Sequence, residues 1–299
     1  MNKMIGSSSS IKIKESLPRR IYIVLSTIFL IGLCILMVAP LIKVIAESFS
    51  SKQFVESGQV LFWPKGFSLL TYEAVLTDRG IRKAFFNSVF ITAVGTAVNV
   101  FMTALMAYPL SRKEFIYRRQ VLLMVTITLI FSAPLIPNYL LIRGLGMDNS
   151  FLAVIVPGAI SGFNLMVMKS FFANLPGELI DASRIDGCSE TGLLFRIVLP
   201  LAKPSIAAVS LFYGVGHWNS LQGPLMYLRK ANLQTLQIRL YQMIQANQTN
   251  FSDMVENFVA APQSIKATTI VVATVPILLV YPFLQKHFVQ GATLGSVKE

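Results

Sequence analysis

The sequence predicts an all-α membrane protein with about six transmembrane helices. Of its 299 residues, 54% are hydrophobic and only 13% are charged, whereas a soluble domain carries roughly 25% charged residues. The apolar residues gather into six stretches that meet or approach the roughly 20 residues that a spanning helix needs. Positive charges flank these stretches instead of interrupting them. Lipid is therefore the expected surroundings of most of the chain.

The six stretches set the domain organisation. We expect one transmembrane domain over residues 21–288, between an N-terminal segment (1–20) and a C-terminal tail (289–299). The first stretch resembles a secretory signal peptide in its basic flank, but it is longer than the usual core of about 7–15 residues, and no small-residue cleavage site follows. An uncleaved helix is therefore favoured. The predicted spans are approximately 21–43, 84–110, 120–142, 149–172, 204–228 and 266–288.

The basic residues predict the orientation. The N-terminal segment holds five Lys or Arg residues, and the connection 111–119 holds Arg112, Lys113, Arg118 and Arg119. Short segments rich in Lys and Arg stay on the cytoplasmic side. Two spans separate these segments, so the two placements agree with each other. Six spans then leave both termini in the cytoplasm.

Charge and cysteine content exclude several other classes of protein. The net charge of +12 is accounted for by residues beside the spans, so no nucleic-acid partner is expected. Cys34 lies in an apolar run and Cys188 in a polar loop, which supports neither a disulfide framework nor a metal site. His217 has no Cys, His or carboxylate at ligand spacing, so it predicts no metal site either.

The spans hold no residues that would supply energy for transport. Their uncharged cores contain no Asp, Glu, Lys or Arg, and His217 is the one histidine in them. Ion-driven transporters usually keep acidic residues or histidine inside the membrane. If the chain transports a solute uphill, the energy therefore enters from another subunit.

Neutral polar residues in the spans form a candidate substrate path. Amide groups that bond sugar hydroxyls, beside an aromatic face for the sugar ring, suit a carbohydrate. The alternative is that these groups bond across helix contacts, as polar residues in membrane bundles often do. The candidate path residues are His217, Trp218, Asn219, Gln222 and Asn164.

The connection between the fourth and fifth spans, residues 176–204, predicts two short amphipathic helices. Glu178 and Asp181 suit the start of the first helix, and Leu179, Ala182 and Ile185 give it one apolar face. Gly187 suits a left-handed turn that ends it. A second helix is expected to end before Pro200. Such a pair can dock into a groove on a partner or lie on the lipid surface.

This connection resembles the EAA loop of permease subunits in binding-protein-dependent ABC importers. The matching residues are Asp181-Ala182-Ser183, Asp186-Gly187, Phe195, Leu199-Pro200 and Pro204. Asp181 stands where the family has Glu, and Ser183 stands where it has its second Ala. Charge and small volume are kept at those two positions.

The resemblance extends over nearly the whole chain. Residues 134–147, 212–219 and 290–298 resemble the carbohydrate branch of these permeases, which includes the maltose type. The segment Phe62-Trp63-Pro64-Lys65-Gly66-Phe67 is most similar to the sub-branch that handles oligosaccharides or polysaccharide fragments.

The resemblance implies a type I ABC importer transmembrane fold in a bacterial cytoplasmic membrane. It implies a second, different permease subunit, two ATPase subunits and an extracytoplasmic sugar-binding protein. No Gly-x-x-x-x-Gly-Lys-Ser/Thr loop occurs in the chain, so ATP and Mg²⁺ would be used by the partner ATPase. This subunit is expected to bind no cofactor and to be no enzyme.

The resemblance also implies two sets of contacts with the ATPase. The C-terminal set is Gly291, Gly295 and Lys298. The coupling set is Asp181, Ala182, Ser183, Ile185, Asp186, Gly187, Phe195, Leu199 and Pro200.

Three other functions stay open at this point. The same architecture could import a non-sugar solute. A secondary transporter is disfavoured by the missing membrane acids. A membrane scaffold without transport would depend on the long outward loops and not on residues 176–204.

Overall fold

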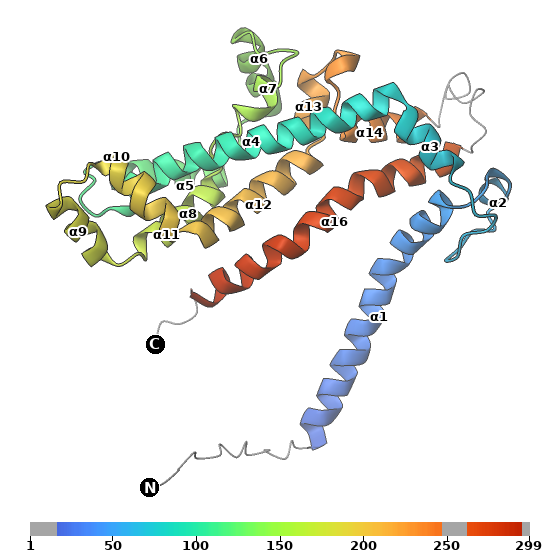
Figure 1. Cartoon of the computed structure of the whole chain (residues 1–299), viewed down its shortest axis with the longest axis horizontal. Coiled ribbons are helices and arrows are strands. Elements are labelled where there is room, and N and C mark those ends of the chain that lie inside the picture. The colour runs from blue at the N-terminus through green and yellow to red at the C-terminus, as the bar shows by residue number, and fades with distance from the viewer. Residues whose placement is uncertain (1–16, 247–261, 295–299) are drawn as a thin grey trace, which may run out of the picture.

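Three long helices frame the computed structural model, which describes residues 17–246 and 262–294 (Figure 1). They are α1 (Leu17–Ser48), α4 (Arg79–Ser111) and α16 (Pro262–Leu294), and each contains a stretch long and apolar enough to cross a membrane. The described residues contain no β-strand. The predicted all-α membrane fold is therefore present.

Helix α1 leaves the rest of the bundle at an angle and meets α16 near its own C-terminal end (Figure 1). Its buried residues are Ala46 and Ser48, both in the last turn. There the Thr268 hydroxyl donates to the backbone oxygen of Ser48 at 3.4 Å. The remaining Leu, Ile and Val side chains are mostly exposed, which suits a helix surrounded by lipid or by another chain.

The predicted span over 120–142 is divided into two helices. The chain forms α5 (Arg118–Ile130) and α6 (Leu135–Gly144), whose axes differ by 118°. Pro134 occupies the N-cap position of α6. Proline lacks an N–H group and disfavours the helical conformation of the residue before it, so the helix ends and a new one starts in another direction.

The predicted spans over 149–172 and 204–228 are also divided. The first region forms α7 (Leu152–Ile155) and α8 (Gly162–Ala173), with Pro157 and Gly158 between them. The second forms α12 (Lys203–Asn219) and α13 (Gln222–Tyr227). Ser220, in extended conformation, ends α12. Pro224 lies in the first turn of α13, where its missing N–H would have had no partner.

The number of spans stays a prediction. By length and composition, three of the described helices can cross a membrane, or five if each of two bent helix pairs counts as one span. The long helices also exceed their predicted limits. Helix α1 begins at Leu17, inside the predicted N-terminal segment, and α16 runs to Leu294, inside the predicted tail.

The short helices lie at the two ends of the bundle and beside its middle. They are α2 (Lys52–Glu56), α3 (Leu70–Thr77), α9 (Gly177–Ile185), α10 (Glu190–Leu193), the π-helical turn η1 (Leu194–Val198), α11 (Leu199–Leu201), the 3₁₀ turn η2 (Ala231–Leu233) and α14 (Leu236–Ala246). We name the end that carries α9–α11 the α9 end, and the end that carries α2, α3 and α14 the α14 end (Figure 1).

The largest buried core joins the α9 end to the bundle. It packs side chains of α4, α8 and α12 against α9, α10 and η1. Leu165, Met168 and Phe172 of α8 are completely buried there, as are Leu193 and Val198. The connection between the fourth and fifth predicted spans is therefore part of the folded core and not a free loop.

Candidate functional site

Helix α9 ends in the turn that its glycine predicts. Gly187 has φ +79°, and Cys188 N–H donates to Ser183 O at 3.0 Å while Gly187 N–H donates to Arg184 O at 3.0 Å. These two bonds make a Schellman motif, which needs a left-handed residue at the position of Gly187. The predicted left-handed conformation is confirmed.

Most of the apolar side chains of helix α9 are exposed. Ile180 is buried in the core and holds the helix in place, whereas Ile185 is 85% exposed. Leu179 and Ala182 are exposed as well. The predicted apolar face therefore points away from the bundle. A face of this kind is available for a partner or for lipid.

The second helix of the connection runs further than predicted. Helices α10, η1 and α11 follow one another without a break from Glu190 to Leu201, so the expected end before Pro200 is wrong. Ser189 caps the start, where its hydroxyl accepts from Gly192 N–H at 3.2 Å. Pro200 is tolerated because it stands in the first turn of α11, directly after the π turn. Such π turns recur at functional positions in helices.

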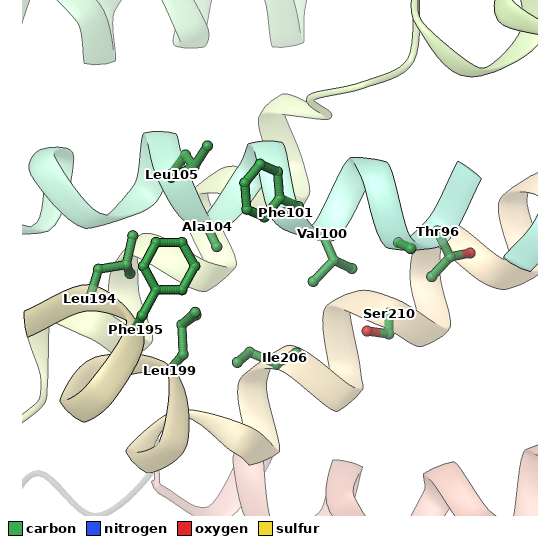
Figure 2. Close-up of a pocket in the computed structure, with 11 residues that line it drawn as sticks. Thr96, Val100, Phe101, Ala104, Leu105, Leu194, Phe195, Leu199, Ile206 and Ser210 are labelled. Atoms are coloured by element: carbon green, nitrogen blue, oxygen red, sulfur yellow. The ribbon is translucent and has the colours of Figure 1, made fainter. Parts of the chain in front are cut away.

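A cavity of about 250 Å³ lies between α4, α12 and the η1–α11 segment (Figure 2). Its walls are mostly apolar, and the hydroxyl groups of Thr96 and Ser210 lie toward one end. Phe195 and Leu199, both in the predicted coupling set, line the cavity. The Phe195 ring stacks on Phe101 of α4, with centroids 6.4 Å apart. These two residues thus face the bundle, unlike Ile185.

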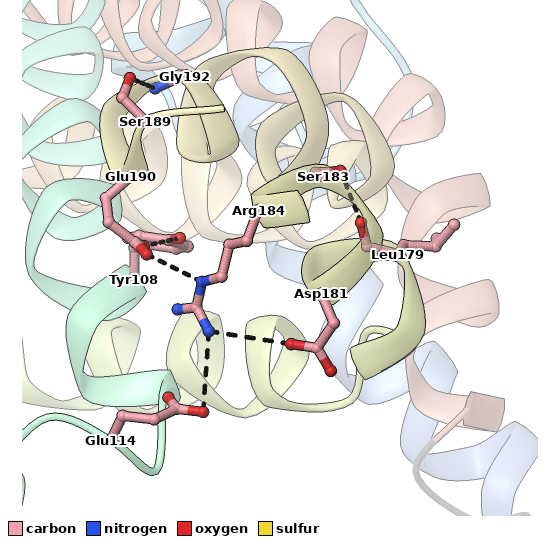
Figure 3. A network of polar contacts seen from close by, with 9 residues as sticks. All are labelled: Tyr108, Glu114, Leu179, Asp181, Ser183, Arg184, Ser189, Glu190 and Gly192. Carbon is pink, nitrogen blue, oxygen red and sulfur yellow. Dashed lines mark hydrogen bonds and ion pairs between the residues drawn. The ribbon is translucent and has the colours of Figure 1, made fainter. Parts of the chain in front are cut away.

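Five polar side chains form what we name the Arg184 network (Figure 3). Arg184 Nε lies 3.0 Å from Glu190 Oε1, while its Nη1 lies 3.9 Å from Asp181 and 4.0 Å from Glu114. The Tyr108 hydroxyl of α4 donates to Glu190 Oε2 at 2.5 Å. The network therefore connects α9, α10, the 112–117 connection and α4.

The network keeps Glu190 ionised. The hydrogen bond from Tyr108 has the largest effect and holds the pKa of Glu190 below its usual value of 4.5, against burial, which acts in the opposite direction. The hydrogen bond and the charge of Arg184 lower this pKa further. A carboxylate whose pKa is lowered in the folded state contributes stability above its usual pKa and loses it as pH falls. The link between Arg184 and Glu190 is therefore charged throughout the neutral range.

The candidate path residues point to different neighbours. Trp218 is 6% exposed, and its Nε1–H donates to Ala273 O of α16 at 2.9 Å. His217 instead faces α4, where Asn99 Nδ2 lies 3.0 Å from its Nε2. Asn219 and Gln222 are exposed, and Asn164 is buried. The only polar side-chain atom of Trp218 is used within the bundle, which favours a helix–helix contact for this residue. Its contact with a sugar stays a prediction.

The family model for the inner membrane component of binding-protein-dependent transport systems matches residues 92–293. The chain belongs to this family. The matched segment includes the Arg184 network, the cavity and both helices of the 176–204 connection. The protein is thus a membrane-embedded subunit of such a transport system, and the family resemblance seen in its sequence is confirmed.

Relatives of this permease match it over nearly its whole length. A polygalacturonan/rhamnogalacturonan transport system permease protein of Bacillus subtilis (strain 168) is 43% identical, over 90% of this chain and 96% of the relative. An arabinooligosaccharides transport system permease protein of Halalkalibacterium halodurans is 30% identical, over 92% and 97%. The crystal structure of a bacterial ABC transporter involved in the import of the acidic polysaccharide alginate is similar, with a TM-score of 0.87 and 26% identity over 92% and 99% of the two chains.

Sequence reasoning missed two pairs of residues of this permease that the fold brings together. Tyr108 and Glu190 are 82 positions apart, and Asn99 and His217 are 118 apart. No local pattern pairs residues so distant. The one available signal was the polarity of Asn99 in an apolar span. Of the predicted tail contacts, Gly291 lies in α16, and Gly295 and Lys298 lie outside the described residues.

Gly95 lets α4 and α12 of the permease approach each other. A Cβ atom at this position would lie 2.7 Å from Nε2 of His217, a ring that Asn99 holds in place. We expect Gly95→Ala to lower the free energy of unfolding by about 1–3 kcal/mol, as overpacking does. Thermal unfolding of the purified permease measures this. Gly216→Ala is the matched control, since a Cβ there meets nothing within 4 Å. An equal loss from both variants would contradict the packing argument.

Proposed function

We propose that this chain is one of two membrane-spanning subunits of an ATP-driven importer for a sugar, and that α9 couples it to a separate ATPase. The observation that carries the coupling is the exposed apolar face of α9, held in place by the Gly187 turn and the buried Ile180. An amphipathic helix with such a face is a common form of docking element. The family match over this segment supports docking over a resting place on lipid.

The proposed orientation places the α9 end in the cytoplasm. The 111–119 connection lies at this end and carries Arg112, Lys113, Arg118 and Arg119, and basic residues in short connections favour the cytoplasmic side. The predicted cytoplasmic location of both termini agrees with this orientation. The ATPase, with its ATP and Mg²⁺, would then bind α9 from the cytoplasmic side of the membrane. A sugar-binding protein would approach the α14 end from the opposite side.

The proposed substrate is a polysaccharide fragment that carries carboxylates. Two relatives support this: the 43% identical permease is named for polygalacturonan and rhamnogalacturonan, and the alginate importer handles an acidic polysaccharide. A neutral arabinooligosaccharide is the second candidate, because the 30% identical relative is named for it.

Ile185→Glu tests the coupling proposal. Because Ile185 is 85% exposed, a charge there leaves the fold of the permease intact. We expect binding of the ATPase to weaken about tenfold or more, as when an apolar anchor at the centre of an interface is lost. Co-purification with the ATPase and ATP hydrolysis by the whole complex in lipid vesicles measure the effect.

Ile116→Glu is the matched control. Ile116 is 84% exposed and lies in the 112–117 connection, outside α9. Retained ATPase binding in the Ile185 variant would contradict the coupling role of α9. In the same vesicles, binding-protein-dependent uptake of oligogalacturonate is expected to exceed uptake of arabinooligosaccharide and of an amino acid. The reverse order would contradict the proposed substrate class.

A further inference from the structure

We propose that Glu190 and Tyr108 are positioning residues that transmit movement of α9 to α4. The inference rests on the proposed coupling role of α9. It assigns a task to two residues that lie outside the predicted coupling set. Together with Arg184, they form a continuous polar connection from the docking helix to the long helix of the bundle (Figure 3).

Glu190 has a separate partner for each carboxylate oxygen. Its Oε1 pairs with Arg184 of α9 at 3.0 Å, and its Oε2 accepts from Tyr108 of α4 at 2.5 Å. Charge-assisted hydrogen bonds of this length are about twice as strong as neutral ones. Asp181 and Glu114 lie 3.9 and 4.0 Å from Arg184, so Glu190 is the carboxylate of the network at hydrogen-bond distance from it.

Helix α9 needs such a connection because it has little other attachment. Ile180 is its one buried side chain, and the turn at residues 186–189 separates it from α10. A docking helix held only by one apolar side chain and a glycine turn would pivot when pulled. The Arg184–Glu190 pair spans that turn and joins α9 to the helix that begins at Glu190.

Tyr108 passes the movement into the bundle. It is 6% exposed, and Arg112 lies over its ring at 5.2 Å. Five residues before it on α4, the Thr103 hydroxyl lies 2.7 Å from the hydroxyl of Tyr213 on α12. That same Tyr213 oxygen accepts from Ser161 N–H at 2.8 Å, directly before α8. A shift of α4 at Tyr108 therefore reaches α12 and α8 through the hydrogen bonds of Tyr213.

A second contact would also transmit movement of the α10–η1–α11 helix to α4. Phe195 follows Glu190 on the continuous α10–η1–α11 helix and stacks on Phe101 of α4. The helix thus contacts α4 at a polar point in α10 and at an aromatic point in η1. Movement at Glu190 would also change the wall that Phe195 and Leu199 give to the cavity (Figure 2).

The test measures sugar imported per ATP hydrolysed by the whole complex in lipid vesicles. Glu190→Gln removes the charge and keeps the shape, while Tyr108→Phe removes only one oxygen. In each variant we expect ATPase binding to persist and the ratio to fall about five- to tenfold, as when coupling between two sites is weakened. The double variant should be no worse than the more affected single variant, because both break one connection.

Glu114→Gln is the matched control, since Glu114 lies at 4.0 Å from Arg184 and contacts neither α10 nor α4 through the network. A merely structural role would lower import and hydrolysis in proportion and leave the ratio unchanged. An unchanged ratio in both Glu190→Gln and Tyr108→Phe overturns the inference. If Ile185→Glu leaves ATPase binding intact, the proposed function itself fails, and the two failures are thereby distinguished.

Discussion

Replacing Gly187 with Val is expected to abolish the hydrolysis that the binding protein stimulates. Gly187 has φ +79°, and a Cβ atom there would meet nothing within 4 Å. The expected effect is therefore one of backbone conformation and not of steric contact with neighbours. A β-branched residue is a genuine outlier at positive φ, at a strain of about 2–3 kcal/mol. That strain reduces the population of the native turn roughly 30- to 150-fold.

Gly187→Asn tests whether the effect comes from the left-handed backbone conformation or from another role of the glycine. Asparagine tolerates the left-handed conformation, so the Asn variant should keep most of the stimulated hydrolysis and of the ATPase binding. Both variants would be compared in vesicles that contain the whole complex, after insertion of the permease is verified. Equal loss in the two variants would show that the turn conformation is not what matters, and normal activity of the Val variant would contradict the coupling role of the turn.

Replacing Trp218 with Ala is expected to lower the free energy of unfolding by about 3 kcal/mol or more, as truncation of a buried tryptophan does. The ring packs edge-on against Phe85 at 5.9 Å, and its N–H bonds Ala273 O at 2.9 Å. It thereby joins α12 to α4 and α16. Thermal unfolding of the purified permease measures the loss.

Trp218→Phe keeps most of the packing and removes the hydrogen bond, so a smaller loss is expected from it. Uptake per correctly folded complex should change little in either variant. Asn219→Ala is the comparison for transport, because Asn219 is adjacent and exposed. Lost uptake with unchanged thermal stability of the Trp218 variants would support the prediction that the indole contacts the sugar.

The features of the fold that were predictable depend on neighbours in sequence. Apolar runs long enough to span a membrane predict helices α1, α4 and α16, because in lipid each backbone group must be paired within its own helix. The left-handed turn at Gly187 is equally local, since it depends on one residue without a Cβ atom. The residues at which the helices begin and end were harder to predict from the sequence. Helix α16, for example, continues through Gly291 to Leu294.

The breaks in the middle spans were only partly predictable. Pro134, Pro137 and Pro157 are visible in the sequence, but proline in a membrane helix can kink it, break it or be accommodated. The 118° angle between α5 and α6 depends on what each half packs against. Pro200 shows the opposite outcome, because the π turn before it lets the helix continue.

The sequence by itself determined the membrane class of this protein, its family and the position of helix α9, since these depend on composition and on motifs along one segment. The tertiary structure decided which polar residues act together. Trp218 and His217 are adjacent, yet they face α16 and α4, because successive residues of a helix point about 100° apart. Glu190 and Tyr108 are far apart in sequence, yet the Tyr108 hydroxyl donates to Glu190 Oε2 at 2.5 Å. The buried core shared by α4, α8 and α10 brings these two residues together.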